Sequence, residues 1–359
     1  MKQYEQRLTR DLSEIQKRVV NVGRRVGRAL DEAVKGVVSF NKEQLNQVML
    51  HDHPINRETR AIDQLCHSFV ARHLPAARHL RFVSSVLRLT VAIERIGDYA
   101  VTLGRVSVRL SQPLHKDTLA HVQAMGDRAI QMLSDALDAF EGGDVSQART
   151  TKKIAKEIDE LHDTLFTEVM AAGDERTLRE VVSVVTILSH IERVSDQAKN
   201  ICEEVLFVET GETKQPKTYR ILFVDETNSL ISPLACAIAE KAFPESGRYA
   251  SAGWAPSGEF HPALDRISDS LGLDISDTGP TILQEMTGPS PYHVIVLLRP
   301  DESEVLPEIP FHTIVLRWSL GPSPEGGKES FDTRLEQMAR DLSVRIQELM
   351  VTLRGDDAR

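Results

Sequence analysis

The sequence contains few aromatic residues, few cysteines and no long hydrophobic run. Aromatic residues make up 5% of the 359 residues, a low share that, with abundant Ala, Leu, Val, Arg and Glu, favours helices. The three cysteines are widely spaced and odd in number, which argues against a disulfide framework or a CxxC-type metal site. No apolar run approaches the ~20 residues that span a bilayer, and the charged first residues do not resemble a secretory signal. We therefore expect a cytoplasmic protein.

The net charge of −10 is distributed unevenly along the chain. Residues 217–359 carry 13 Lys and Arg against 22 Asp and Glu, so this part would repel a phosphate backbone and we expect no nucleic-acid partner. Residues 1–28 instead carry eight basic and three acidic side chains. That segment is either a solvated helix face or, at most, a surface for peripheral contact with an anionic membrane or an acidic partner.

Two different hydrophobic patterns divide the chain. Residues 1–210 have apolar side chains at three- and four-residue spacing and are predicted to be helical almost throughout. The polar stretch 211–218 contains a Gly and a Pro and is predicted to be a linker. Strand and helix patterns then alternate, which predicts a small α/β domain over 219–355 with a four-stranded parallel sheet. We expect strands at 220–224, 293–298 and 313–316, and helices at 233–243, 262–271 and 329–353.

The helical part contains an internal repeat. NVGRRVGRALDEAV (21–34) aligns with AMGDRAIQMLSDAL (124–137), and VAIERIGDYAVTLG (91–104) aligns with SHIERVSDQAKNIC (189–202). This self-similarity predicts two units of three helices each, which together form a six-helix bundle. The repeats span about 1–110 and 111–210.

Each repeat ends with a helix that carries two carboxylates at i, i+4 spacing and therefore on one face. The pairs are Glu94 with Asp98 and Glu192 with Asp196, and the second copy adds Asn200. Hard oxygen ligands projecting from bundle helices suit Fe, Mn, Mg or Ca, and Zn is a further candidate. The alternative is an ordinary charged helix face, neutralised by the arginines beside the carboxylates.

Two three-helix repeats that each close with Glu-Arg-[Ile/Val]-x-Asp resemble the PhoU family of phosphate-signalling regulators. The resemblance covers about residues 1–210 and implies a cytoplasmic homodimer that restrains phosphate uptake. It implies two partners, the ATPase of a phosphate transporter and a membrane sensor kinase. Thr102 replaces the expected Asn of the first copy, and Pro54 interrupts the second helix of that repeat, so metal binding there is in doubt. The metal ligands that the resemblance implies are Glu94, Asp98, Glu192, Asp196 and Asn200.

The segment ILFVDETNSLISPLACAIAE (221–240) resembles the opening of low-molecular-weight phosphotyrosine phosphatases and arsenate reductases. Their pattern is a strand, then Cys-x5-Arg-Ser-Pro, then a helix, and their chemistry needs a thiolate, an arginine clamp and an acid. Here Asp225 stands at the Cys position, Ile231 at the Arg position and Gly321 at the position of the acid. We therefore expect no catalysis, and we expect an ionised Asp225 at the rim of the loop to repel phosphate.

The remaining loop positions are predicted to preserve the shape of the loop. Asn228 and Ser229 are expected to do so through hydrogen bonds, and Ser232 is predicted to cap a helix whose first residue is Pro233. The leading hypothesis is a non-catalytic adaptor whose C-terminal domain senses a ligand or acts as a scaffold. The alternatives are a metal-binding helical bundle with a structural C-terminal partner, a dimerisation scaffold, and an active phosphatase or arsenate reductase.

Overall fold

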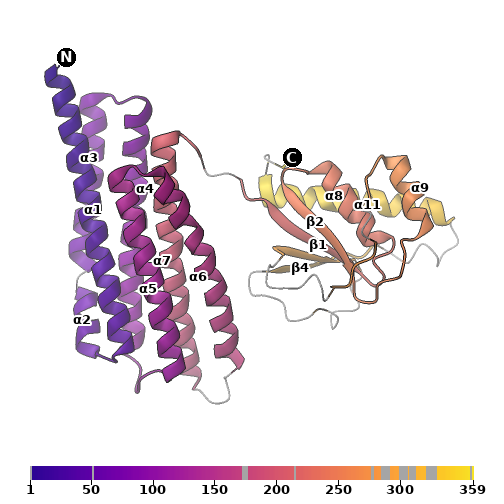
Figure 1. The fold of residues 1–359 in the computed structure, drawn as a ribbon, viewed down its shortest axis with the longest axis horizontal. Coiled ribbons are helices and arrows are strands. Elements are labelled where there is room, and N and C mark those ends of the chain that lie inside the picture. Colours follow the sequence, from indigo (N-terminus) through magenta and orange to yellow (C-terminus); the bar gives the residue numbers. More distant parts are fainter. Residues whose placement is uncertain are drawn as a thin grey trace. The chain divides into compact units, whose positions relative to one another are not determined.

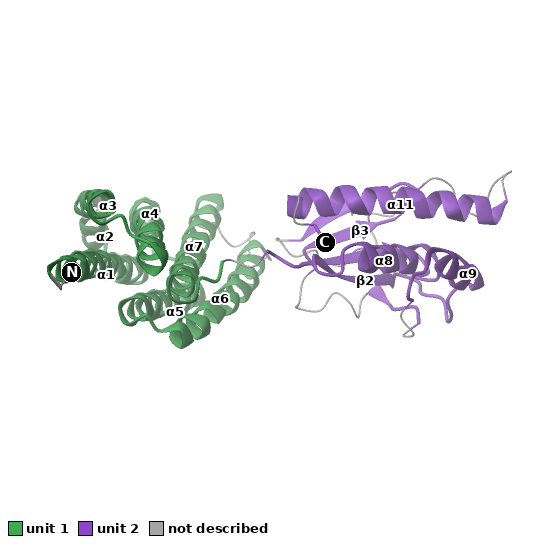
Figure 2. Ribbon diagram, turned by 90° about the horizontal axis from the view of Figure 1, so that it is seen from above, with its two compact units in different colours: residues 1–214 green, residues 215–359 purple. Residues whose placement is uncertain are grey.

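The chain forms two compact units, Met1–Lys214 and Gln215–Arg359 (Figures 1 and 2). The structure is a computed structural model. The described residues are 2–50, 52–171, 177–213, 216–275, 279–283, 292–298, 306, 313–320, 330–355 and 358–359.

The first unit is helical over its described residues, which confirms the predicted bundle. The second helix of the first repeat is given as α2 and α3, because residue 51 between them lies outside the described residues, so seven helical segments are described. Pro54, which is expected to interrupt the second helix of this repeat, lies within the described helix α3 near its beginning. The helices are α1 (Lys2–Val38), α2 (Lys42–Leu50), α3 (Asp52–His73), α4 (Ala77–Ser107), α5 (Lys116–Gly142), α6 (Val145–Ala171) and α7 (Leu178–Thr210).

The first helices of the two repeats, α1 and α5, approach closely at two matched glycines. A Cβ atom on Gly23 would lie 2.6 Å from Cδ2 of Leu137, and one on Gly126 would lie 2.7 Å from Cγ1 of Val34. The repeat alignment matches Gly23 to Gly126 and Val34 to Leu137. The two contacts are therefore equivalent, and the repeats are related by an approximate twofold arrangement.

The last helices of the two repeats, α4 and α7, also pack against each other. The Arg88 guanidinium donates to both carboxylate oxygens of Glu204 at 2.5 and 2.6 Å. Arg78 makes the same forked contact with Glu209 at 3.0 and 2.5 Å. Two-point arginine–carboxylate pairs fix orientation as well as distance. The helices that carry the predicted carboxylate pairs are thus held in register across the repeat boundary.

The second unit has a parallel sheet in the order β2-β1-β3-β4, which confirms the predicted α/β class. The strand β2 was not located from the sequence. Figure 1 shows α8 and α11 on the same side of this sheet, where they share a core with α9 and β1. The elements are β1 (Tyr219–Asp225), α8 (Ile231–Ala242), β2 (Gly247–Gly253), α9 (Pro262–Leu271), β3 (Val294–Leu297), β4 (Ile314–Arg317) and α11 (Phe331–Arg354).

The strand order places the loop after β1 at a distinctive position. The chain adds β2 on one side of β1 and β3 on the other, so the order reverses beside β1. In open parallel sheets, ligand sites form at the carboxyl ends of strands at such a reversal. The loop 226–230, between β1 and α8, lies at that end of the sheet.

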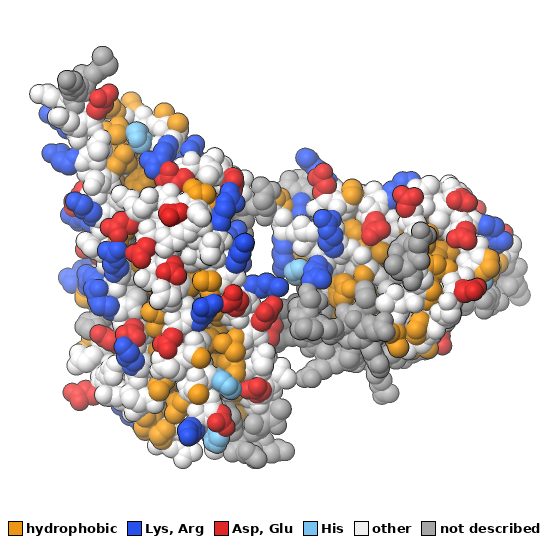
Figure 3. All heavy atoms as spheres, viewed as in Figure 1, with side chains coloured by type: hydrophobic (Ala, Val, Ile, Leu, Met, Phe, Trp, Pro, Cys, Tyr) orange, Lys and Arg blue, Asp and Glu red, His pale blue; other side chains and the backbone are white. Residues whose placement is uncertain are grey.

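The surface of the helical unit carries mixed charge. On α1, Arg18 contacts Glu14 at 2.7 Å, and Arg24 contacts Asp138 and Glu141 of α5 at 3.1 and 2.6 Å. Figure 3 shows basic and acidic side chains interspersed over the visible face of this unit. These pairs favour the solvated-face interpretation of residues 1–28. In the part of the chain that the structure describes, no helix is both long and apolar enough to cross a bilayer.

Candidate functional site

The carboxylate pair of the second repeat lies on the part of α7 that faces α6. Glu192 is half-buried, and its electrostatic neighbours are Asp196 on the same helix and Asp159 and Asp163 on α6. Burial, followed by these three carboxylates, raises the pKa of Glu192 to about 7, although the adjacent Arg193 lowers it. Four acidic side chains therefore share one region of the helical unit, and Glu192 holds a proton for part of the time near neutral pH.

Two members of this acidic set, Asp159 and Asp163, were not predicted as site residues. They have the same i, i+4 spacing on α6 as Glu192 and Asp196 have on α7, and that spacing was the available signal. At the matching positions the first repeat has Asn56 and Arg60. The two repeats therefore differ in charge next to their carboxylate pairs, and the second is the more acidic.

The other predicted ligands lie elsewhere. Asn200 lines a groove of about 480 Å³ between α4 and α7, together with Arg88 and Arg95, and neither Glu192 nor Asp196 lines that groove. On α4, Glu94 is half-buried and Asp98 is exposed. The hydroxyl of Thr102, which stands where the resemblance expects Asn, donates to the backbone carbonyl of Asp98 at 2.9 Å.

The donor chemistry of the second repeat suits a hard cation, since carboxylate oxygens are the ligands that Fe, Mn and Mg prefer. Over the described residues, however, no three His, Cys, Asp or Glu side chains converge as a metal site requires. A metal would need Glu192, Asp196 and the aspartates of α6 to move closer together.

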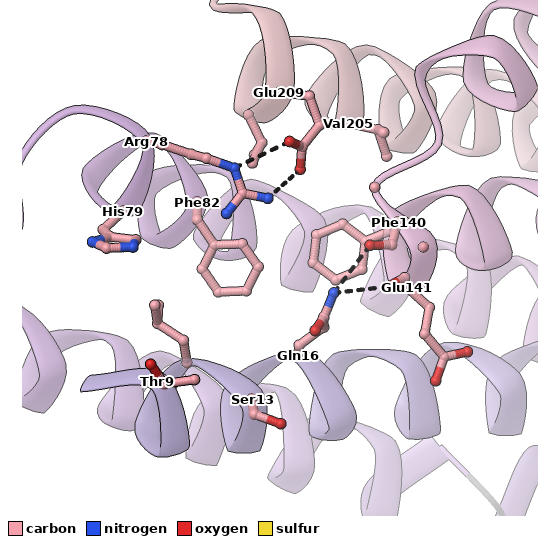
Figure 4. A pocket seen from close by; sticks show the side chains of 14 residues that line it. Thr9, Ser13, Gln16, Arg78, His79, Phe82, Phe140, Glu141, Val205 and Glu209 are labelled. Atoms are coloured by element: carbon pink, nitrogen blue, oxygen red, sulfur yellow. Dashed lines mark hydrogen bonds and ion pairs between the residues drawn. The ribbon is translucent and has the colours of Figure 1, made fainter. Parts of the chain in front are cut away.

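A cavity of about 320 Å³ opens where α1, α4, α7 and the end of α5 meet. Figure 4 shows Phe82 and Phe140 side by side, and their ring centroids lie 5.8 Å apart in a stacked arrangement. The Gln16 amide donates to the carbonyl oxygens of Phe140 and Glu141 at 3.2 and 3.1 Å. These carbonyls belong to the last turn of α5, which lacks helical partners for them. Side chains that line this cavity therefore connect the first repeat to the second.

In the second unit, the loop after β1 surrounds the carboxylate of Asp225. One carboxylate oxygen accepts the backbone N–H of Asn228 at 2.6 Å, and the other accepts that of Ser232 at 2.8 Å. Asp225 is only 7% exposed. The expectation that this carboxylate lies at the rim of the loop is wrong, because the loop amides draw it inward.

The side chain of Asn228 fixes the shape of the loop. Its Nδ2 donates to the Ser232 hydroxyl at 2.9 Å, and its Oδ1 accepts the N–H of Thr281 at 2.7 Å. Its φ of 49° lies in the left-handed region. Gly253 at the end of β2 is also required, because a Cβ there would lie 2.7 Å from the carbonyl oxygen of Glu226. Ser229 takes part too, through a hydroxyl contact with Thr227 at 2.7 Å.

The prediction that Ser232 caps α8 is wrong. The helix begins at Ile231, its cap position is Leu230, and no side chain at that position caps it. The N–H of Ser232 is instead satisfied by Asp225, which reaches it from the end of β1. The Ser-Pro pattern predicts a cap from the serine side chain, but the local sequence does not show that the Asp225 carboxylate reaches the start of the helix.

The groups needed for phosphoryl or arsenate chemistry are missing from the described part of this loop. Ile231 is half-buried and has no charge, and Cys236 lies within α8 against the core. Burial raises the pKa of the Cys236 thiol to about 12, so it is not a thiolate at neutral pH. Gly321, at the position of the general acid, lies outside the described residues.

Comparison with known proteins gives a family for the helical unit. The PhoU domain model matches residues 19–106 and 122–205, one match in each repeat. The chain is 30% identical over 240 residues to the phosphate-specific transport system accessory protein PhoU homolog of Pseudomonas putida. That match covers 66% of this chain and 92% of the relative. The resemblance predicted from the repeats is confirmed.

Solved structures resemble both units. The phosphate transport system regulatory protein PhoU of Streptococcus pneumoniae superposes with a TM-score of 0.55 at 28% identity, covering 58% of this chain and 99% of that one. An arsenate reductase of Archaeoglobus fulgidus gives a TM-score of 0.31 at 22% identity, covering 36% of this chain and 97% of that one.

Proposed function

The chain belongs to the PhoU family, and on that premise we propose that it is a negative regulator of phosphate uptake and of phosphate-starvation signalling. It acts in the cytoplasm as a homodimer, by contact with the ATPase of a phosphate transporter and with a membrane sensor kinase. The second unit is a non-catalytic domain attached to this regulator, with a scaffolding or ligand-sensing role.

The observation that carries this proposal is the pair of complete repeats. Both matches to the family model fall within the helical unit, and the repeats are joined by the matched glycine contacts and by the arginine pairs between α4 and α7. The relatives that match at about 30% identity bear names of phosphate-transport accessory proteins. A non-catalytic second unit is supported by Asp225 and Ile231 at the positions where a nucleophile and an anion clamp are needed.

The test is co-purification of the full chain from phosphate-replete and phosphate-starved cells. We expect the ATPase of the phosphate transporter to be retained from replete cells, at a level that changes on starvation. The double variant Arg88→Ala with Arg78→Ala is compared with wild type in the same experiment. It lacks both forked ion pairs between α4 and α7, so it tests whether retention of the partner depends on the contact between the repeats. Retention of neither the ATPase nor a sensor kinase from either culture would contradict the proposal.

A second candidate function is metal binding at the acidic set of the second repeat. The specific observation is that Asp159 and Asp163 of α6 lie near Glu192 and Asp196 of α7. Elemental analysis of the purified full chain tests it. Bound Fe, Mn, Zn or Mg in the wild-type chain that is lost in Glu192→Gln and retained in Glu94→Gln would support this function, and absence of metal from the wild-type chain would exclude it.

A further inference from the structure

The carboxylate of Asp225 occupies a place that would otherwise attract an external anion. Ser232 is the second residue of α8, so its N–H is one of the donors that the helix itself cannot pair. The helix dipole also adds partial positive charge at this end. Converging loop amides at a helix N-terminus form a site that suits phosphate or a carboxylate.

Here the anion is already supplied by the chain. The two carboxylate oxygens of Asp225 accept separate loop amides at 2.6 and 2.8 Å, distances typical of hydrogen bonds to a charged acceptor. We propose that the Asp225 carboxylate acts as a built-in anion. It occupies the loop amides that an external anion would need, and it thereby closes this loop of the second unit to phosphate. This inference does not rest on the proposed regulatory role.

Two repulsive features strengthen the closure. An incoming oxyanion would meet the negative charge of Asp225 in a region that is shielded from water, where like charges repel more strongly than they do at the surface. Ile231, the residue before Ser232, offers an apolar side chain and no positive charge to compensate. Phosphate would therefore have to displace the carboxylate before it could contact the same amides.

The loop has supports that do not involve Asp225. Asn228 bonds to Ser232 and to Thr281, and the backbone of residues 226 and 227 accepts N–H groups from Ala255 and Ser257 at 2.9 Å. Removal of the carboxylate should therefore leave the loop amides aimed at an empty space. Because this space is bordered by the N–H groups of Asn228 and Ser232, a small anion should be able to refill it.

The test uses Asp225→Ala in the full chain, because this change removes a group the size of formate. Both tryptophans, Trp254 and Trp318, lie in the second unit, so their fluorescence reports its unfolding alone. We expect the melting midpoint of the variant to fall by roughly 5 °C or more. Formate should restore most of that loss, while wild type and the exposed-residue control Glu226→Ala show only the small shared effect of added salt. An equal response to formate in all three proteins would overturn the proposal.

A second measurement does not depend on the folding of any variant. Wild-type protein is titrated with inorganic phosphate at constant ionic strength, and the tryptophan-reported midpoint is followed. We expect no saturable rise. A saturable rise in the millimolar range or below would show that the loop accepts an external anion and would overturn the proposal. Co-purification with the transporter ATPase is unaffected by either result, so failure here is distinct from failure of the proposed function.

Discussion

Replacement of Glu192 by Gln tests whether the acidic set of the second repeat costs stability at neutral and alkaline pH. The pKa of Glu192 is raised from 4.5 in the unfolded chain to about 7 in the folded one. The folded state therefore holds this proton more tightly, and the associated stability is present below pH 4.5 and is lost as the pH rises through 7. A shift of this size corresponds to about 3 kcal/mol, and solvent screening of a half-buried group reduces the expected effect to about 1–2 kcal/mol.

The assay is urea unfolding of the full chain, followed by tryptophan fluorescence, which reports the second unit alone, and by far-UV circular dichroism, to which the longer helices of the helical unit contribute most of the signal. Glu192→Gln should be within about 1 kcal/mol of wild type at pH 5 and about 1–2 kcal/mol more stable at pH 8, in the helical signal only. Glu94→Gln is the matched control, because Asn56 and Arg60 stand where the second repeat has Asp159 and Asp163. A Glu192→Gln variant that keeps the pH dependence of wild type, or that is less stable at pH 8, would refute the reasoning.

The packing of the helical unit and the missing chemistry of the second unit lead to three further predictions. Gly126→Ala should destabilise the helical unit by about 1–2 kcal/mol, because its Cβ would meet the stiff Val34 side chain, and the added change Val34→Ala should recover most of the loss in urea unfolding. Phe82→Ala should cost about 3 kcal/mol, measured the same way, since it opens the aromatic stack at the repeat junction. Hydrolysis of an aryl phosphate should be undetectable, and turnover that disappears in Asp225→Ala would contradict a non-catalytic second unit.

The repeat pattern predicted the helical unit well, because each repeat buries one continuous apolar stripe and the alignment of two copies reinforces the prediction. The signal for β2 was weaker, because its segment GRYASAG is rich in Gly and Ala and has only a short buried run at its end. That strand is defined by its pairing with β1, from Tyr219 opposite Gly247 to Asp225 opposite Gly253. Long-range pairing of this kind leaves little local trace in the sequence.

The candidate sites were predicted less completely than the fold. A spacing rule along one helix identified Glu192 and Asp196, but it could not show that α6 brings Asp159 and Asp163 to the same region. The loss of the catalytic groups was predicted from residue types, yet the inward position of Asp225 depends on where the loop amides point. Contacts between separate elements decide both features.

The most direct test of the central claim is expression of the full chain in bacteria that lack their own phosphate-transport accessory protein. Output from a phosphate-starvation promoter is measured in phosphate-rich medium. The account predicts that the full chain lowers this output towards the level of the parent strain, and that Asp225→Asn does so equally well because the second unit is not a catalyst. Unchanged output with soluble, folded protein in the cells would contradict the claim that the chain is a regulator of phosphate uptake.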